Sequence, residues 1–412
     1  MAEIQKSQVN DMVAFYESGI KQDQHALGVE LEYTLVKNNG EQVKYDDEFG
    51  QKWLMEQLKS DYPTPMLDEV GHLIGIKNDR DSVTLEPAGQ FELSAGPFNE
   101  IQEVRNTFLS FITRISKLVV PHDMFLHALG YHPSRRAEDL EIIPKVRYGL
   151  MNEYFLKTSP LGIRMMRATG STQVSIDYDS EADCVRKLRI AYLCVPIFAL
   201  LTDNTPYFEG HPRTHHLMRT EVWEDCDKSR CGLVPGVLSP DFCFEKYATY
   251  VLSSPAMFEM YGSEGHVSCR PITEVYLDKK MDFEQCANAS SHLFNDVRLK
   301  NFIEIRPADA LPIDHMSAYV ALIKGLFYGS GTLDALEELF GSQSEEAFES
   351  AKFALKQDGF DAIVYGMNAD ALSKKIIEIA ERGLLPHEQR FLGPLHRIAE
   401  DKMTLADRLV PL

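Results

Sequence analysis

Residues 28–33 read Gly28-Val29-Glu30-Leu31-Glu32-Tyr33, an alternation of acidic and apolar side chains. Successive side chains of a β-strand point to opposite faces, so Glu30 and Glu32 share one face and the apolar residues share the other. The stretch therefore predicts a strand with one carboxylate face and one aliphatic face.

Four further stretches repeat this alternation, with acidic or polar residues on one parity. A sheet built from such strands would bury an aliphatic face and present a row of carboxylates on the other face. The stretches are Thr84-Leu85-Glu86, Gln90-Phe91-Glu92-Leu93-Ser94, Gln173-Val174-Ser175-Ile176-Asp177 and Ile303-Glu304-Ile305-Arg306.

Clustered carboxylates repel one another unless a cation joins them. Hard oxygen ligands suit Mg²⁺, which proteins commonly share with substrate phosphates, so the row predicts a metal–nucleotide site. For each strand taken alone, an antiparallel sheet with one solvated face is the better interpretation. Such a face favours Thr, Lys and mixed charges, whereas this chain repeats Glu at the positions in question.

The composition is that of a globular protein, with 412 residues, 44% hydrophobic and 25% charged. The net charge of −20 argues against nucleic acid or an anionic membrane as partner, since both attract basic surfaces. The longest apolar run, Ile190–Leu201, contains Pro196 and is shorter than the ~20 residues that span a bilayer. Met1–Lys6 has no signal- or transit-peptide pattern, and the seven Cys form no Cys-x-x-Cys pair. These features predict reduced thiols and a cytoplasmic location.

Strand and helix patterns mix without regular βαβ alternation, which predicts the α+β class. The chain has no Gly-x-x-x-x-Gly-Lys-Ser/Thr loop and no Gly-x-Gly-x-x-Gly turn, so a nucleotide would bind on the carboxylate face. Hydrophobic periodicity predicts helices over Gln5–Lys21, Asp46–Ser60, Phe98–Val120 and Glu181–Leu201, the last buried on one side. Asn204–Gly236 is rich in Gly, Pro and His and is predicted as a long loop, and helices follow from Asp314.

Six motifs follow one another between Gly28 and Asp309. They are Gly28–Glu32, Leu85–Ser94, Pro144–Tyr148, Met165–Val174, Met218–Arg230 and Val297–Asp309. As an ordered set they resemble the glutamate–cysteine ligases of the plant and proteobacterial type, which share the catalytic fold of glutamine synthetase. The resemblance implies a curved antiparallel sheet with helices on its apolar face, in one catalytic domain over 1–412 whose part 313–412 is a mainly helical tail.

The resemblance also implies an activity. ATP would phosphorylate the γ-carboxylate of glutamate, and the amino group of L-cysteine would attack the γ-glutamyl phosphate to give γ-glutamylcysteine, the first step of glutathione-type thiol synthesis. The implied cofactors are ATP and Mg²⁺, and the implied partners are these small molecules, with no nucleic acid and no membrane. The expected assembly is a monomer or a homodimer.

The family motifs assign roles to residues of this chain. The catalytic residues would be Arg306 and Glu304, of which Arg306 lies on the same strand parity and would meet the transferred phosphoryl group. A structural ion pair between the two is the alternative. The implied metal ligands are Glu30, Glu32, Glu86, Glu92 and Glu304.

The resemblance implies further residues for the substrates. Arginine can bind an α-carboxylate through two hydrogen bonds, and Trp223 would stack on such a pair. Two surface arginines and a core tryptophan are the alternative. The implied substrate-binding residues are Arg147, Arg219, Trp223 and Arg167, the implied cofactor-binding residues are Gln90, Lys145 and Arg230, and Arg164 is a lesser candidate.

Three rival functions are weighed against this ligase. Ser175 and the stretches Gly232–Gly236 and Pro307–Ile313 depart from the family pattern, so a γ-glutamyl ligase of the same fold with another acceptor amine is the first rival. A glycoside hydrolase with paired Glu residues is the second, but it would leave the Arg and Trp set without a role. A binding protein without activity is the third, but all five strands keep their acidic or polar positions.

Overall fold

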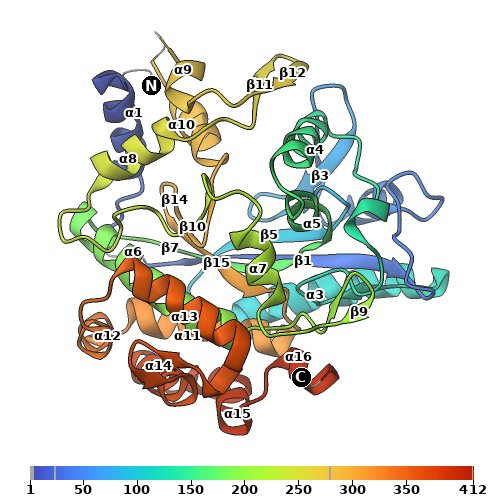
Figure 1. Ribbon diagram of the computed structural model, residues 1–412. Coiled ribbons are helices and arrows are strands. Elements are labelled where there is room, and N and C mark those ends of the chain that lie inside the picture. Colours follow the sequence, from blue (N-terminus) through green and yellow to red (C-terminus); the bar gives the residue numbers. More distant parts are fainter. Residues whose placement is uncertain (1–3, 23–24, 278–279, 411) are drawn as a thin grey trace.

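The computed structural model describes residues 4–22, 25–277, 280–410 and 412, so Met1–Glu3, which entered the prediction of location, lie outside it. Its centre is an antiparallel sheet in the order β14-β15-β7-β1-β5-β4-β3-β2, with β6 also paired to β1 (Figure 1). This confirms the predicted α+β class. The strands are β1 Leu27–Lys37, β2 Thr64–Leu67, β3 Leu73–Lys77, β4 Ser82–Leu85, β5 Phe91–Phe98, β6 Met124–His127, β7 Ser171–Ile176, β14 Val297–Leu299 and β15 Ile303–Asp309.

The strand register places the acidic positions on one face. Glu32 lies directly opposite Glu92, and Glu30 lies between Ser94 on one side and Gln173 on the other. Residues directly opposite in an antiparallel pair project from the same face. The five stretches, which the sequence alone does not place together, are thus neighbours in one sheet.

Three helices cover the apolar face of the sheet, namely α3 Ile101–Val119, α6 Glu181–Leu201 and α11 Ile313–Tyr328 (Figure 1). The aliphatic positions of the strands, such as Leu31 and Leu93, are buried beneath them. Helix α3 follows its predicted amphipathic pattern, because its buried residues recur every three or four positions.

The predicted one-sided burial of α6 is wrong, because nearly the whole helix is buried. One side contacts β14 and β15, and the other contacts the C-terminal helices α12–α14. A helix between two layers needs apolar residues all round, which weakens the periodic signal.

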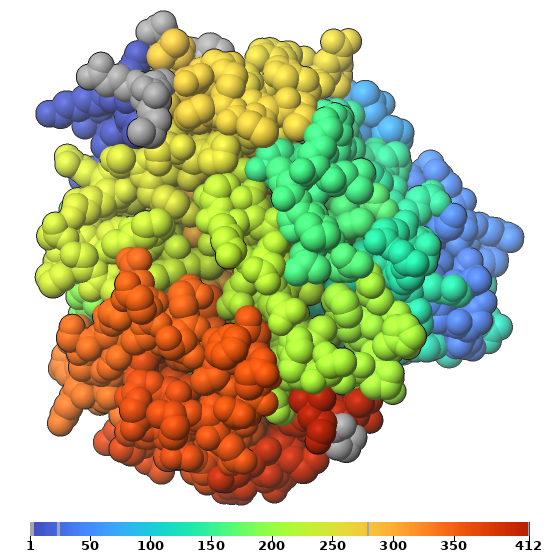
Figure 2. Space-filling view, in the orientation of Figure 1, coloured from blue at the N-terminus to red at the C-terminus, as the bar shows by residue number. Residues whose placement is uncertain are grey.

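The C-terminal part is helical, as predicted, and packs through α11 against α3 and β7. Figure 2 shows these helices as one continuous surface, and it shows α1 against the later segment that carries α8 and α10. The remaining helices are α1 Lys6–Glu17, α2 Gln51–Leu58, α4 Val146–Thr158, α5 Gly162–Ala168, α7 Met218–Glu224, α8 Phe244–Ser253, α9 Ile272–Val275, α10 Phe283–Ser290, α12 Thr332–Phe340, α13 Glu345–Asp358, α14 Ala369–Gly383, α15 Gly393–Asp401 and α16 Leu405–Leu409.

The predicted loop Asn204–Gly236 is partly wrong, because it contains α7 and short paired strands. Met218 and Val222 are the buried apolar pair of α7, and seven residues give too few turns for a periodic signal. The short strands of the molecule are β8 Tyr207–Phe208, β9 His211–Pro212, β10 Cys231–Gly232, β11 Phe258–Tyr261, β12 Glu264–Val267, β13 Phe294–Asn295, β16 Ile363–Val364 and β17 Met367–Asn368. Among the described residues, none of the helices combines the length and the apolar character that crossing a membrane requires.

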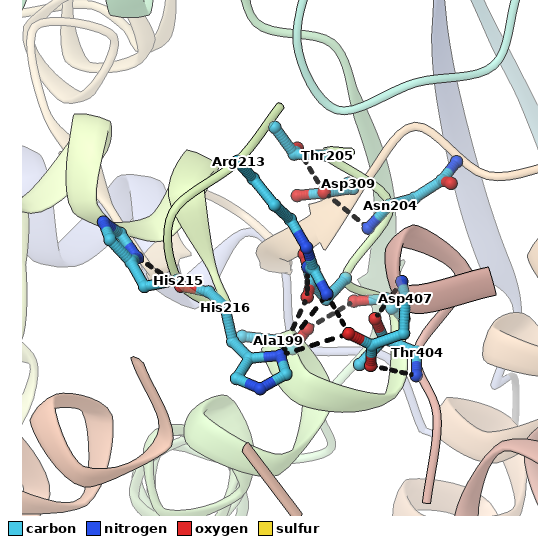
Figure 3. Close-up of polar contacts among 11 residues, drawn as sticks. Ala199, Asn204, Thr205, Arg213, His215, His216, Asp309, Thr404 and Asp407 are labelled. Carbon is cyan, nitrogen blue, oxygen red and sulfur yellow. Dashed lines mark hydrogen bonds and ion pairs between the residues drawn. The ribbon is translucent and has the colours of Figure 1, made fainter. Parts of the chain in front are cut away.

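A buried ion network ties the last helix to the segment after α6 (Figure 3). The Arg213 side chain is fully buried and donates to Asp203 at 2.6 Å and to Asp407 on α16. Next to it, Asp309 at the end of β15 accepts from the backbone N–H of Asn204 at 2.8 Å and from Thr205 Oγ1 at 2.7 Å. The C-terminal helix is thus connected through this segment to the strand that carries Arg306.

Replacing Arg213 with Met is expected to lower the free energy of unfolding by about 3–5 kcal/mol, because it leaves a buried carboxylate without its cation. Urea denaturation would measure the loss. Adding Asp203→Asn to this variant is expected to restore part of the stability, since the unpaired charge is then removed. A loss below about 1 kcal/mol would show that this buried ion pair contributes no more to stability than an exposed ion pair does.

Candidate functional site

A cavity of about 300 Å³ lies on the carboxylate face of the sheet. Strands β1 and β5 and the turn after β4 supply acids from one side, and α4, α7 and the β14–β15 region supply cations and aromatic rings from the other. Of the predicted site residues, the cavity is lined by Glu30, Glu32, Glu86, Gln90, Glu92, Lys145, Arg147, Trp223 and Arg306.

Four of the lining carboxylates have no cationic partner. Within the described residues, no Lys, Arg or His forms an ion pair with Glu30, Glu32, Glu86 or Glu92; their hydrogen bonds come from neutral groups such as Ser94, which donates to Glu92 at 2.7 Å. Burial, followed by repulsion from Glu92, raises the pKa of Glu30 to about 7 and that of Glu86 to about 8. A divalent cation would remove the cause of both shifts, so this donor set fits a hard metal ion.

The four carboxylates do not form a closed cage. In the described part of the chain, the only acid and His side chains that gather three ligand atoms within 4.8 Å of one another are Glu100, His387 and Glu388. In that group Lys324 already pairs with Glu388 at 2.7 Å, so the negative charge of Glu388 is balanced without a metal ion. An ion in the cavity would therefore complete its shell with oxygens of a bound substrate.

Mg²⁺ is expected to bind more tightly at about pH 8 than at about pH 6, because it must displace protons from carboxylates with raised pKa values. Raised carboxyl pKa values stabilise the metal-free protein at low pH, and this contribution is lost as pH rises through about 7–8. The Mg²⁺-induced rise in Tm, measured without nucleotide, should therefore be larger at the higher pH. An equal rise in Tm at both pH values would show that Mg²⁺ does not bind to these carboxylates.

Glu304 is surrounded by cations rather than left free. Its Oε2 accepts from Arg298 at 2.7 Å and from Arg306 at 3.0 Å, and its Oε1 accepts from Lys300 at 2.8 Å. These cations hold the pKa of the fully buried Glu304 well below its usual range, against the effect of burial. The alternative of an ion pair with Arg306 is thus observed, and the metal-ligand role of Glu304 stays a prediction.

Two guanidinium groups lie against the ring of Trp223. The Arg219 and Arg306 Cζ atoms are each 5.5 Å from the ring centroid. Arg219 is 4% exposed and donates a long hydrogen bond of 3.4 Å to the carbonyl of Pro307. Arg147 on α4 lies over Phe258 and donates to Ser291 at 2.8 Å. Of the predicted substrate residues, Arg147 and Trp223 thus line the cavity, and Arg219 lies at its margin against Trp223.

Two predicted site residues lie elsewhere. Arg230 is fully buried and donates to Asp227 at 2.6 Å, to Tyr154 and to the carbonyl of His292 at 2.8 Å each. Arg167 donates to Asn152 at 2.6 Å and to the carbonyl of Leu140 at 3.0 Å. Neither lines the cavity, and both guanidinium groups are hydrogen-bonded within the protein. The assignments of Arg230 to cofactor binding and of Arg167 to substrate binding stay predictions.

The remaining candidates divide in the same way. Lys145 lines the cavity above the ring of Tyr148 at 4.3 Å and has no carboxylate partner among the described residues. Gln90 lines it too, but its amide donates to the carbonyl of Thr169 at 2.9 Å. The lesser candidate Arg164 is held by Glu209 at 2.9 Å. The lining residues Arg298 and Lys300 have no role in the sequence prediction. Arg298 lies opposite Glu304 in the antiparallel pair β14–β15, and basic residues this close before an acidic strand position are a signal for such an ion pair.

Comparison with known proteins places the chain in a family context. The model of a family described as "Glutamate-cysteine ligase family 2 (GCS2)" matches residues 26–412. The chloroplastic glutamate–cysteine ligase of Arabidopsis thaliana is 29% identical over 416 residues, which cover 98% of this chain and 79% of that protein. The chloroplastic enzyme of Brassica juncea is 28% identical over 401 residues, which cover 95% and 77%.

A solved structure shares the fold. The crystal structure of a glutamate–cysteine ligase from Francisella tularensis in complex with AMP has a TM-score of 0.56 and 10% identity, and the match covers 95% of this chain and 85% of that one. The curated relatives are named as chloroplastic proteins. These names contradict the prediction of a cytoplasmic location, which is therefore wrong.

Proposed function

The chain belongs to glutamate–cysteine ligase family 2, and we propose that it uses ATP to join the γ-carboxylate of glutamate to the amino group of L-cysteine. The observation that carries the proposal is one cavity that combines four carboxylates lacking cations with the fixed guanidinium groups of Arg147 and Arg306. The four carboxylates would bind the metal ion of a metal-bound nucleotide, and the guanidinium groups would bind a dicarboxylate amino acid. Family membership removes the hydrolase and binding-protein rivals.

The reaction has two steps. The γ-carboxylate of glutamate attacks the γ-phosphorus of ATP, which gives γ-glutamyl phosphate and ADP. The cysteine amine then attacks the acyl carbon, loses a proton and expels phosphate, which gives γ-glutamylcysteine. Mg²⁺, when bound, would neutralise charge on the phosphate oxygens. We propose Glu30, Glu32, Glu86 and Glu92 as its ligands, with Glu304 as a further candidate.

The cations of the cavity have separate tasks in this proposal. Arg306 already has its geometry fixed by Glu304 and Gln173, so it can meet the transferred phosphoryl group without reorganising. Lys145 can pair with a phosphate oxygen of the nucleotide, and Gln90 lies beside it as a neighbour of the acids. One catalytic domain over 1–412 and a monomer or homodimer remain predictions.

Arg219→Ala is expected to raise the KM for glutamate about 100-fold with little change in kcat, since it removes an ion pair made equally in ground and transition states. Steady-state kinetics with glutamate as the varied substrate would measure it. Arg114→Ala, an exposed arginine of α3 that pairs with Asp61, is the matched control. An unchanged KM for glutamate would move Arg219 out of the substrate site.

The function itself is tested by ADP release from the purified protein with ATP, Mg²⁺ and glutamate, with each common amino acid added in turn. Release that depends on cysteine, together with γ-glutamylcysteine in the product, is the expected result. Release with a different amine would retain the mechanism and change the second substrate. No release with any acceptor would overturn the proposal.

A further inference from the structure

Lys352 occupies a position that the pattern of its helix assigns to an apolar residue. Helix α13 buries Phe348, Ala351, Lys352 and Leu355, which recur at the three- and four-residue spacing of one helix face. The Lys352 side chain is 1% exposed, whereas lysine is almost never fully buried unless it is paired. A charge at such a position needs partners that offset the cost of its burial.

The ammonium group of Lys352 lies between two segments that border the cavity. Its Nζ atom is 2.9 Å from Oε1 of Glu224, the last residue of α7, and 3.5 Å from Oδ2 of Asp296, the single residue between β13 and β14. It meets both as a charge, since neither contact has the geometry of a hydrogen bond. The exposed Glu349, one turn earlier on α13, is a third partner at 3.5 Å. Lys352 thus forms a bridge between α7 and the β13–β14 link.

Each end of this bridge is next to a residue that lines the cavity. Trp223 precedes Glu224 on α7, and its ring centroid is 5.5 Å from Cζ of Arg306. The Asp296 carbonyl accepts from the backbone N–H of Arg306 at 3.0 Å, and the Asp296 N–H donates to the carbonyl of Gly232 at 3.1 Å. The separation of Glu224 from Asp296 therefore controls the separation of Trp223 from Arg306.

Without the ammonium group, the two carboxylates would repel each other. Both lie within 3.5 Å of one nitrogen atom, and like charges this close repel strongly in a buried site. Burial raises the pKa of Asp296 despite the attraction of Lys352, and repulsion from Glu224 adds to the rise. Among the described residues, no other cation forms an ion pair with Asp296. Lys356, one turn later on α13, pairs with Glu224 at 2.8 Å and does not reach Asp296.

We propose that Lys352 is a positioning residue: it holds the end of α7 against the β13–β14 link and thereby fixes Trp223 beside Arg306. This inference rests on the proposed function, in which α7 contributes to the glutamate site and Arg306 meets the transferred phosphoryl group. Loss of the ammonium group lets the end of α7 move away from the link. A misplacement of about 1 Å in an active site costs about 100-fold in rate.

The first test is steady-state kinetics of full-length Lys352→Met, with glutamate and ATP varied in turn. The kcat/KM for glutamate is expected to fall about 100-fold, while the KM for ATP changes little, because the four acids and Lys145 lie outside α7. Lys352→Arg, which keeps a cation, should recover part of the rate. Lys356→Met is the matched control: it makes the same change on the same helix, at a lysine that pairs with Glu224 alone, and should behave like the wild type.

A second readout does not depend on activity. The chain has two tryptophans, so Trp53→Phe leaves Trp223 as the only indole ring. In this background, Lys352→Met should move the emission maximum to longer wavelength, because the ring separates from the Arg306 guanidinium and meets water. Lys356→Met should leave the emission spectrum unchanged.

Glu224→Gln removes the charge at the α7 end of the bridge and leaves Lys352 beside Asp296, so it replaces Lys352→Met if that variant does not fold. It should shift both readouts in the same direction.

The outcomes separate positioning from a purely structural role. A Lys352→Met protein with a lower free energy of unfolding but wild-type kinetics and emission would overturn the inference. Equal losses in Lys352→Met and Lys356→Met would also overturn it, since holding the end of α7 would then suffice without the bridge. A wild type that makes no γ-glutamyl product would instead overturn the proposed function, whereas the emission comparison would still test the position of Trp223.

Discussion

Glu30→Gln is expected to lower kcat/KM at millimolar Mg²⁺ by about 1,000-fold or more, since the loss of several kcal/mol of charge stabilisation corresponds to three or more decades in rate. Gln keeps the size of the side chain and one acceptor oxygen, but it removes a charge that forms no ion pair with a cation of the described residues. Glu30 lies in register between Ser94 and Gln173 at the centre of the sheet, so the substitution should not disturb packing.

The measurement is a titration of the rate with Mg²⁺ at saturating ATP and glutamate. Excess Mg²⁺ should recover part of the activity if the defect is metal affinity. Glu264→Gln, on the exposed hairpin strand β12, makes the same chemical change away from the cavity and should behave like the wild type. Wild-type rates at limiting Mg²⁺ would remove Glu30 from the ligand set.

Arg306→Ala is expected to lower kcat by about 1,000-fold or more, because a fixed guanidinium on a transferring phosphoryl group contributes that much in comparable reactions. The fold should survive, since Glu304 keeps Arg298 at 2.7 Å and Lys300 at 2.8 Å. The KM for glutamate should change far less than kcat if Arg306 acts mainly in the transition state.

Two measurements separate this role from that of a structural ion pair. A purely structural Arg306 would reduce the free energy of unfolding in urea while kcat remained near the wild-type value, which would contradict the catalytic assignment. Arg306→Lys keeps the charge but loses the planar guanidinium group, whose Nη1 donates to both Glu304 and Gln173, so it should recover only part of kcat.

The acidic face could be predicted from the sequence because a strand has only two faces and residue parity assigns each side chain to one of them. Once the antiparallel pairing holds, Glu32 and Glu92 must project together. Parity does not say which groups neutralise an acid. Glu304 has the same pattern as Glu30, yet three cations surround Glu304, while no cation in the part of the chain that the structure describes pairs with Glu30.

The arginines show the limit of assignment by motif. Arg219 and Arg230 occur in one motif, but Arg219 lies on α7 at the cavity margin, whereas Arg230 follows the turn after α7 and joins a cluster with Asp227 and Tyr154. Such partners depend on tertiary packing between distant segments, which spacing along the chain does not encode.

The buried contact between Arg213 and Asp407 has a consequence for how the protein is made. Ribosomes add about 5–20 residues per second, so the 194 residues between the two take about 10–40 s to synthesise. During that interval the nascent chain holds Arg213 and Asp203 without the third member of their network. A substitution that weakens the Arg213–Asp407 contact would therefore first lower the yield of folded protein per chain translated. Each molecule that did fold would remain fully active.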